Sequence, residues 1–311
     1  MKILYSIITT VYNAENTIHD SLYSVLNQKH ASYEFELIIV NDGSTDRTNS
    51  ILEDLANLYP NVRIISQENK GISKSIDIAL KSSSGQYIIF LDSDDYLQPN
   101  YLRSIDEILS KEKFDCIQFS MLLNYSSYIK IQSYRNFTTK NKEEIKTFFL
   151  KNYNPSLAIR VFKKELFLNI EFLPISFGAD EVIFLQIVDR IKSLKVIDLP
   201  LYKATVQRSG SVSNEKYSLI KLEKLVIVYK FLINFSFSQA NFYLYYLLKK
   251  YIGLLKLYKK ASSELIHSDK VKLFKIIYIE RQFLFSMLKK VNNPFLKLYL
   301  ILKVFVLIFT L

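Results

Sequence analysis

Two aspartates separated by one residue, in the run Asp92-Ser93-Asp94, follow directly after the apolar segment Tyr87–Leu91. Charged carboxylates do not remain unpaired inside an apolar core, so we expect this pair to open onto a crevice. Mg²⁺ and Mn²⁺ prefer oxygen ligands of this kind, and substrate phosphates often complete their coordination. A capping turn is the alternative for an isolated pair, because Asp94 or Asp95 could cap a helix that begins near Pro99.

A second polar turn, Asn41–Asp46, follows another apolar run. Gly43 permits a tight turn there, and Asp46 is a suitable cap for the next helix. Asp42 stands at the tip of the expected strand, where its carboxylate could accept hydrogen bonds from a base or a ribose. By itself, this motif is typical of a turn more often than of a binding site.

The elements that must position these residues alternate between short apolar runs and amphipathic segments. The apolar runs are Ile3–Ile8, Leu37–Val40, Val62–Ile65 and Tyr87–Leu91. Apolar residues at helical spacing predict one helix after a cap at Asn13, a second helix after Asp46 and a third over residues 73–81. This alternation predicts an α/β fold with a mostly parallel sheet flanked by helices. Because ligands bind at the carboxyl ends of such strands, the polar turns are expected to share one crevice.

Four motifs in this order resemble the family 2 glycosyltransferases of the GT-A fold. The motifs are Ser6–Asn13, Ile39–Asp46, Gln67–Ser73 and Ile88–Asp95. The resemblance is strong over residues 3–110 and weaker over residues 170–214. It implies a GT-A nucleotide-sugar-binding catalytic domain, which we place at residues 1–214.

The resemblance also implies the roles of individual residues toward a nucleotide-sugar donor. The expected donor-binding residues are Thr10, Tyr12, Asp42, Asn69, Lys70, Asp92, Ser93 and Arg208. Asp94 would hold the Mg²⁺ or Mn²⁺ ion that bridges the donor diphosphate. One position departs from the family pattern, because Ile76 stands where relatives carry an arginine. Lys70 or Lys74 could partly replace that missing cation.

The same resemblance places the catalytic base in the segment Phe177–Phe184, where relatives carry an acidic pair. This chain reads Asp180-Glu181 instead of the usual Glu-Asp order. Counting back from Phe184 puts Glu181 at the usual base position, while Asp180 is close enough to be the base. Without the resemblance, two acids in a first helical turn are explained by the helix dipole alone.

The formal net charge of +11 is concentrated in the last third of the chain. Residues 1–214 contain 24 Lys+Arg and 25 Asp+Glu, whereas residues 215–311 contain 17 and 5. The latter segment predicts a basic, mainly helical C-terminal region that contacts an anionic membrane surface. Residues 295–311 are apolar but short for a membrane span and interrupted by two lysines. A helical subdomain packed on the catalytic domain is the alternative.

The resemblance implies an inverting glycosyltransferase that acts on a saccharide or a lipid-linked saccharide in bacterial surface polysaccharide synthesis. We expect a UDP-sugar donor and a cytoplasmic location at the inner face of the plasma membrane. No glycine-rich dinucleotide fingerprint follows the first strand, and no nucleic-acid-binding module is recognised. A single cysteine excludes a disulfide framework within the chain. The alternative is a membrane-docked protein that binds nucleotide sugars without catalysis. The sequence leaves the oligomeric state open.

Overall fold

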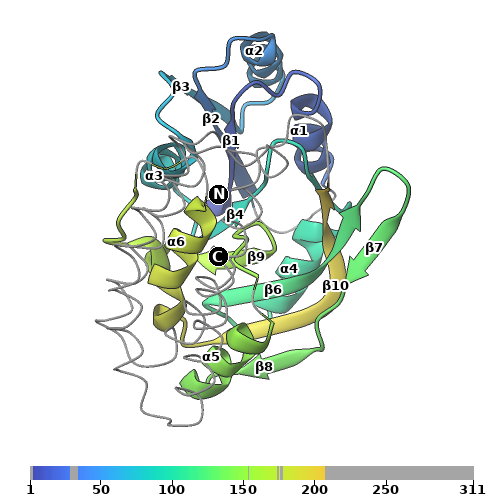
Figure 1. Ribbon diagram of the computed structural model, residues 1–311, viewed down its shortest axis with the longest axis vertical. Coiled ribbons are helices and arrows are strands. Elements are labelled where there is room, and N and C mark those ends of the chain that lie inside the picture. The colour runs from blue at the N-terminus through green and yellow to red at the C-terminus, as the bar shows by residue number, and fades with distance from the viewer. Residues whose placement is uncertain (1–2, 29–33, 153, 174, 176–177, 207–311) are drawn as a thin grey trace, which may run out of the picture. The chain divides into compact units, whose positions relative to one another are not determined.

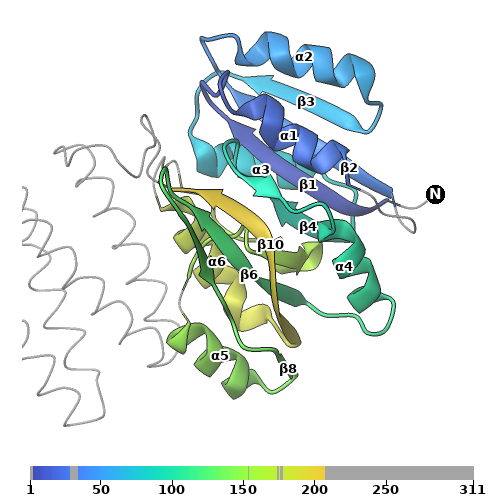
Figure 2. The same ribbon diagram turned by 90° about the vertical axis from the view of Figure 1, so that its right-hand side faces the viewer.

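The computed structural model describes residues 3–28, 34–152, 154–173, 175 and 178–206. They form one sheet with the strand order β3-β2-β1-β4-β9-β6-β10-β5, with helices on both faces (Figures 1 and 2). The predicted α/β class is therefore confirmed. The described residues belong to a compact unit, Met1–Asn214, and a second unit covers Glu215–Leu311. The C-terminal region, with the charge and membrane contact predicted for it, lies outside the described residues.

The first half of the sheet is parallel. It consists of β1 (Ile3–Val11), β2 (Glu34–Asp42), β3 (Val62–Gln67) and β4 (Tyr87–Phe90). Strands β2, β1 and β4 are almost continuously buried, as expected of parallel strands covered on both faces. Because all four strands run the same way, their carboxyl ends meet at one edge of the sheet.

The helices that link these strands are α1 (Ile18–Leu26), α2 (Thr48–Leu58) and α3 (Ile72–Ser82). Figure 1 shows α3 and α1 on opposite sides of the parallel strands. Each helix buries one apolar stripe, with Ile18, Leu22 and Val25 forming the stripe of α1. The cap predicted at Asn13 is wrong, because α1 begins at Ile18 and Asn13 takes a positive φ of 49° in the preceding loop.

The second half of the sheet is mixed, so the sheet as a whole is less parallel than predicted. Strand β9 (Arg160–Lys163) lies antiparallel between β4 and β6 (Cys116–Asn124), and β6 is parallel to β10 (Leu194–Thr205). The strands β5 (Tyr96–Leu97), β7 (Ile129–Gln132) and β8 (Phe137–Thr139) add antiparallel pairs. A short loop such as the one between β6 and β7 can join only antiparallel strands, which explains why β7 runs opposite to β6.

Three further helices and two 3₁₀ turns complete the described chain. They are α4 (Tyr101–Leu109), α5 (Lys142–Lys151), η1 (Lys164–Phe167), α6 (Ala179–Ile187) and η2 (Val188–Arg190). Neither Asp94 nor Asp95 caps α4, since the residue before that helix is Asn100. None of the helices in the described ranges is long and apolar enough to cross a membrane.

Candidate functional site

The loops after β1 and β2 are joined by side-chain hydrogen bonds at the carboxyl edge of the sheet. Asn13 donates its backbone N–H to the Ser44 hydroxyl oxygen at 3.0 Å, and its side-chain oxygen accepts from the Thr45 N–H at 2.8 Å. Asn13 tolerates a positive φ better than most residues, because its short polar side chain can form such local bonds. This residue therefore fixes the end of β1 against the turn that follows β2.

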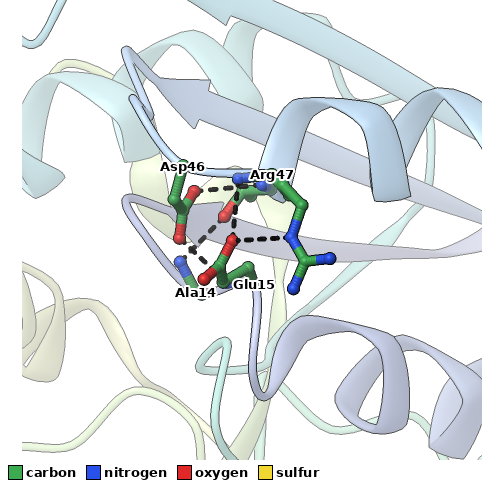
Figure 3. Close-up of polar contacts among 5 residues, drawn as sticks. Ala14, Glu15, Asp46 and Arg47 are labelled. Atoms are coloured by element: carbon green, nitrogen blue, oxygen red, sulfur yellow. Dashed lines mark hydrogen bonds and ion pairs between the residues drawn. The ribbon is translucent and has the colours of Figure 1, made fainter.

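A second connection between the same loops surrounds Asp46 (Figure 3). Its carboxylate accepts from the backbone N–H groups of Glu15 at 3.1 Å and Thr48 at 3.0 Å. Glu15 in turn accepts from the N–H of Arg47 at 3.0 Å and from its guanidinium at 3.2 Å. Burial acts to raise the pKa of Asp46, but the hydrogen bonds from Thr48 and Glu15 outweigh it, and the net pKa is lowered.

The carboxylate of Asp42 holds the loop between β3 and α3. One of its oxygens accepts from the Gln67 amide at 2.6 Å and from the Lys70 N–H at 2.8 Å. The other oxygen accepts from the Gly71 N–H at 2.9 Å. Asp42 is 5% exposed, so these bonds compensate for the burial of its charge. Three strand ends are thereby fixed relative to one another.

Gly43 makes the close approach of these loops possible. Its φ of 76° lies in the left-handed region, and a Cβ at this position would lie 2.8 Å from the Asn69 backbone nitrogen. Any other residue would therefore strain the backbone and push the β3–α3 loop away from Asp42. The glycine of the Asn41–Asp46 turn serves the packing of two loops as well as the turn itself.

The turn after β4 is held by strand β10. The Tyr202 hydroxyl donates to the Asp95 carboxylate at 2.7 Å and accepts from the Asp92 N–H at 3.3 Å. Thr205 donates its backbone N–H to Asp95 and its hydroxyl proton to the Asp94 carbonyl, both at 2.7 Å. Asp95 is therefore a structural anchor, while the turn presents the side chains of Asp92 and Asp94 at the sheet edge.

Asp92 lies near other carboxylates at this edge of the sheet. Its side chain is exposed to solvent, yet neighbouring protein atoms raise its pKa well above the usual value by burial, followed by repulsion from Asp95, Asp180 and Asp94. Asp180 thus lies near Asp92 although it is 88 positions further along the chain.

Asp180 and Glu181, the acidic pair in the first turn of α6, differ in environment. Burial raises the pKa of Asp180 to about 6, against smaller opposing effects from the Leu157 N–H and Arg160. That N–H donates to the Asp180 carboxylate at 3.1 Å. Glu181 is buried, with 9% of its surface exposed. A carboxylate with a pKa near 6 is suited to accept a proton close to neutral pH.

Arg160 is fully buried, and no motif in the sequence marks it as part of the site. Its guanidinium donates to the backbone carbonyls of Ser156 and Asn154 at 2.5 and 2.6 Å and to the Gln118 side chain at 2.8 Å. It also lies over the ring of Phe184 in α6, 4.3 Å from the centroid. Arg160 therefore fixes the loop whose Leu157 N–H holds Asp180. Only the tertiary structure reveals this link.

The crowded carboxylates suit a divalent cation, although no group of three or more candidate ligands is arranged to hold one within the described ranges. Mg²⁺ is commonly bound by one or two carboxylates together with substrate phosphates, so a complete protein cage is not required. The repulsion at Asp92 is the observation that favours a cation, because positive charge there would relieve it. Asp94, with Asp92 beside it, fits that role.

The remaining predicted residues are distributed around the same edge of the sheet. Thr10 is half-buried at the end of β1, Tyr12 is 51% exposed, and Ser93 is half-buried in the turn after β4. Asn69 and Lys70 are exposed in the loop that Asp42 holds. Arg208 lies outside the described residues. Ile76, the departure from the family pattern, is buried in α3.

A family model described as glycosyl transferase family 2 matches residues 6–170, more than half of the chain. The chain belongs to this family. The match covers most of β1, all of β2 to β4 and the turn that carries Asp92 and Asp94, and it extends through β9, which begins at Arg160. Asp180 lies beyond the matched residues.

Curated relatives of this family 2 chain match it over its first part. An uncharacterized glycosyltransferase of Haemophilus influenzae is 39% identical over 109 residues, which are 35% of this chain and 33% of that protein. The minor teichoic acid biosynthesis protein GgaA of Bacillus subtilis is 42% identical over 106 residues, which are 33% of this chain and 24% of that protein. The chain thus spans about a third or less of the length of these relatives.

A solved structure shows the same fold along most of the chain. S. aureus TarS 1–349, solved in complex with UDP-GlcNAc, superposes with a TM-score of 0.61 at 20% identity and covers 91% of this chain and 92% of that one. At this identity the likeness shows the fold alone. The predicted GT-A fold of a family 2 glycosyltransferase is thereby confirmed.

Proposed function

We propose that this chain is an inverting glycosyltransferase that transfers a sugar from a nucleoside diphosphate donor to an acceptor hydroxyl. The observation that carries the proposal is the proximity of Asp180 in α6 to Asp92 in the β4 turn, whose pKa it helps to raise. A candidate base therefore lies near acids suited to a cation and a diphosphate. Family membership provides the reaction class.

The residues of the first half would bind the donor. The loops anchored by Asn13, Asp42 and Asp46 create a rigid edge at which a nucleoside can lie, and Asp92 would contact the ribose or the sugar. Asp94 would hold Mg²⁺ or Mn²⁺, which supplies positive charge beside the departing diphosphate. Because Tyr202 and Thr205 fix this turn from β10, Asp94 would be positioned before the donor arrives.

We assign the role of base to Asp180. Its carboxylate would take the proton of the acceptor hydroxyl while that oxygen forms a bond to the anomeric carbon of the donor. The bond between this carbon and the diphosphate breaks on the opposite face, so the configuration inverts. A pKa of about 6 leaves Asp180 mostly deprotonated at neutral pH and able to act. Glu181 remains the second candidate, and its burial argues against direct contact with an acceptor.

The finer parts of the proposal concern the substrates. We infer a UDP-sugar, hexosyl or N-acetylhexosaminyl, and a saccharide or lipid-linked acceptor in bacterial surface polysaccharide assembly at the inner face of the plasma membrane. The names of the relatives support this context, because one of them acts in teichoic acid biosynthesis and others are chondroitin and hyaluronan synthases. The solved TarS complex with UDP-GlcNAc supports a uridine donor.

Calorimetric titration of the purified chain with UDP, with and without Mn²⁺, tests the proposal. We expect binding that depends on the metal and is abolished in Asp94→Ala. Binding of a different nucleoside diphosphate would change the donor and keep the reaction class. If no nucleotide binds with any metal, the proposal is wrong. Binding without turnover of any UDP-sugar would favour the non-catalytic binding protein instead.

A further inference from the structure

The hairpin of β6 and β7 carries an apolar tip that is exposed to solvent. The side chains of Tyr128, Ile129 and Ile131 are 56%, 55% and 56% exposed. Three of the large apolar side chains that stay exposed within the described ranges therefore lie within four residues of one another. Scattered exposed apolar residues need no explanation, but a local group of them marks an interaction surface. We refer to residues 125–131 as the hairpin tip.

The hairpin tip has a defined structure. The Tyr125 N–H donates to the Tyr128 carbonyl at 2.9 Å, and the two rings stack with centroids 4.6 Å apart at 14°. Strand β7 pairs with β6 through Asn124 opposite Ile129, and no other described strand pairs with it. Among the described residues, nothing pairs with its outer edge. Proteins usually protect such edges, so an open strand with two isoleucines on one face indicates a partner.

The charge around the hairpin tip narrows the choice of partner. Residues 116–142 contain no aspartate or glutamate but four basic residues. Lys130 on β7 and Arg135 just after it are exposed. Figure 1 shows the turn between β6 and β7 at the margin of the described unit. An apolar tip with tyrosines and with exposed basic side chains on the same hairpin complements the interface of a membrane with anionic headgroups.

We propose that the β6–β7 hairpin is a docking surface for an anionic lipid bilayer. A second copy of the chain fits the observations less well, because a stable dimer buries about 800 Å² on each partner. Three exposed side chains supply far less area than that. Lipid needs no large complementary surface, since tyrosine and isoleucine enter the headgroup region individually.

The position of the hairpin suits the proposed function. Strand β6 runs in the same direction as β4, because both are antiparallel to β9 between them. Asn124, the last residue of β6 before the hairpin turn, pairs with Thr205, whose N–H donates to Asp95 in the β4 turn. The docked hairpin would hold the β4 turn near the bilayer. Only this consequence depends on the proposed function, whereas the docking surface itself does not.

A fluorescent probe at position 127 tests the docking directly. Cys116 is the single cysteine, and it is fully buried with a pKa raised to about 12 by burial, so Ser127→Cys adds the one reactive thiol. An environment-sensitive label there should shift to shorter wavelength with vesicles of phosphatidylcholine and phosphatidylglycerol. Vesicles of phosphatidylcholine alone should give a smaller shift. A label at Leu58→Cys, a 68% exposed position on α2, is the control and should not respond.

Matched substitutions measure the contribution of the tip to binding. Ile129→Ser with Ile131→Ser should lower the vesicle partition coefficient on the order of tenfold for each residue, since each loses apolar area in the bilayer. Leu58→Ser with Leu168→Ser removes two equally exposed apolar side chains elsewhere and should leave binding unchanged. Lys130→Glu should weaken binding about fivefold or more, and only to anionic vesicles.

Three results would overturn the proposal. The probe at position 127 remains silent while the full chain sediments with anionic vesicles, which would place the membrane contact elsewhere. The isoleucine variant and the Leu58/Leu168 control bind vesicles equally well. The probe responds to protein concentration without vesicles, which would identify a second copy as the partner. Nucleotide binding is measured separately, so none of these results decides the proposed function.

Discussion

Asp42 and Asp92 lie at the ends of two strands of the same sheet, and their carboxylates have opposite electrostatic environments. Asp42 is almost fully buried and accepts three hydrogen bonds from Gln67, Lys70 and Gly71. Asp92 faces three other carboxylates, which together with burial raise its pKa. The hydrogen bonds therefore stabilise the charged form of Asp42. The neighbouring carboxylates destabilise the charged form of Asp92 in the absence of a ligand.

This difference distinguishes a structural residue, Asp42, which orders the loops around it, from Asp92, whose environment suits the binding of a cation. A satisfied carboxylate orders the backbone around it, and its removal should cost stability. A crowded carboxylate lowers stability, and it is retained in a fold where positive charge can later relieve the repulsion.

The largest effect is expected at the acidic pair of α6. Asp180→Asn should lower kcat by about 10²- to 10⁴-fold, because the amide cannot accept the proton of an acceptor. UDP affinity should change little, since the donor loops are elsewhere. Glu181→Gln is the matched control and should retain most activity. Measurement of kcat for both variants decides between them, and a greater loss in Glu181→Gln would reverse our assignment of the base.

The same base gives the reaction a pH dependence. The pKa of Asp180 is raised to about 6, and a base must be deprotonated to act. The kcat/KM of the wild type should therefore fall as the pH is lowered through about 6, because this parameter reports the free enzyme. The acidic limb should be absent from the residual activity of Asp180→Asn. An unchanged limb in this variant would assign the titration to another group.

At the satisfied carboxylate, Asp42→Ala should lower the free energy of unfolding by about 2–3 kcal/mol, because three donors lose their acceptor. Urea denaturation monitored by circular dichroism measures this loss. Asp20→Ala, on the exposed side of α1, is the control and should change stability by less than about 0.5 kcal/mol. Equal stability of the two variants would contradict the structural role of Asp42.

The smallest effect has the opposite sign. Asp92→Asn should raise the free energy of unfolding by less than about 0.5 kcal/mol while activity falls, because the amide removes a repulsion that solvent partly screens at this exposed side chain. A raised pKa costs stability once the pH exceeds the ordinary value of 3.8, since the unfolded chain then loses the proton more readily. The gain should therefore grow as the pH rises above about 4. A decrease in the free energy of unfolding of Asp92→Asn would show that the Asp92 carboxylate, like that of Asp42, stabilises the fold.

Much of the site was predictable because it depends on local patterns. The four buried runs predicted the parallel strands, and the rule for parallel sheets predicted that Asp42 and Asp92 meet at one edge. The cap predicted at Asn13 failed because a side chain that can cap a helix can equally bind a neighbouring loop, as Asn13 does with Thr45. Propensity alone does not distinguish the two outcomes.

The fold class, the family and the polar strand ends of the first half follow from the amino-acid sequence, since each depends on residues close together in the chain. Which carboxylates accept hydrogen bonds and which face other carboxylates depends on tertiary packing. Three contacts depend on long-range packing. Tyr202 donates a hydrogen bond to Asp95, and Asp180 lies near Asp92. Arg160 bonds the loop whose Leu157 N–H donates to Asp180. The environment of a carboxylate is set by the groups that folding brings around it, and spacing in the sequence does not contain that information.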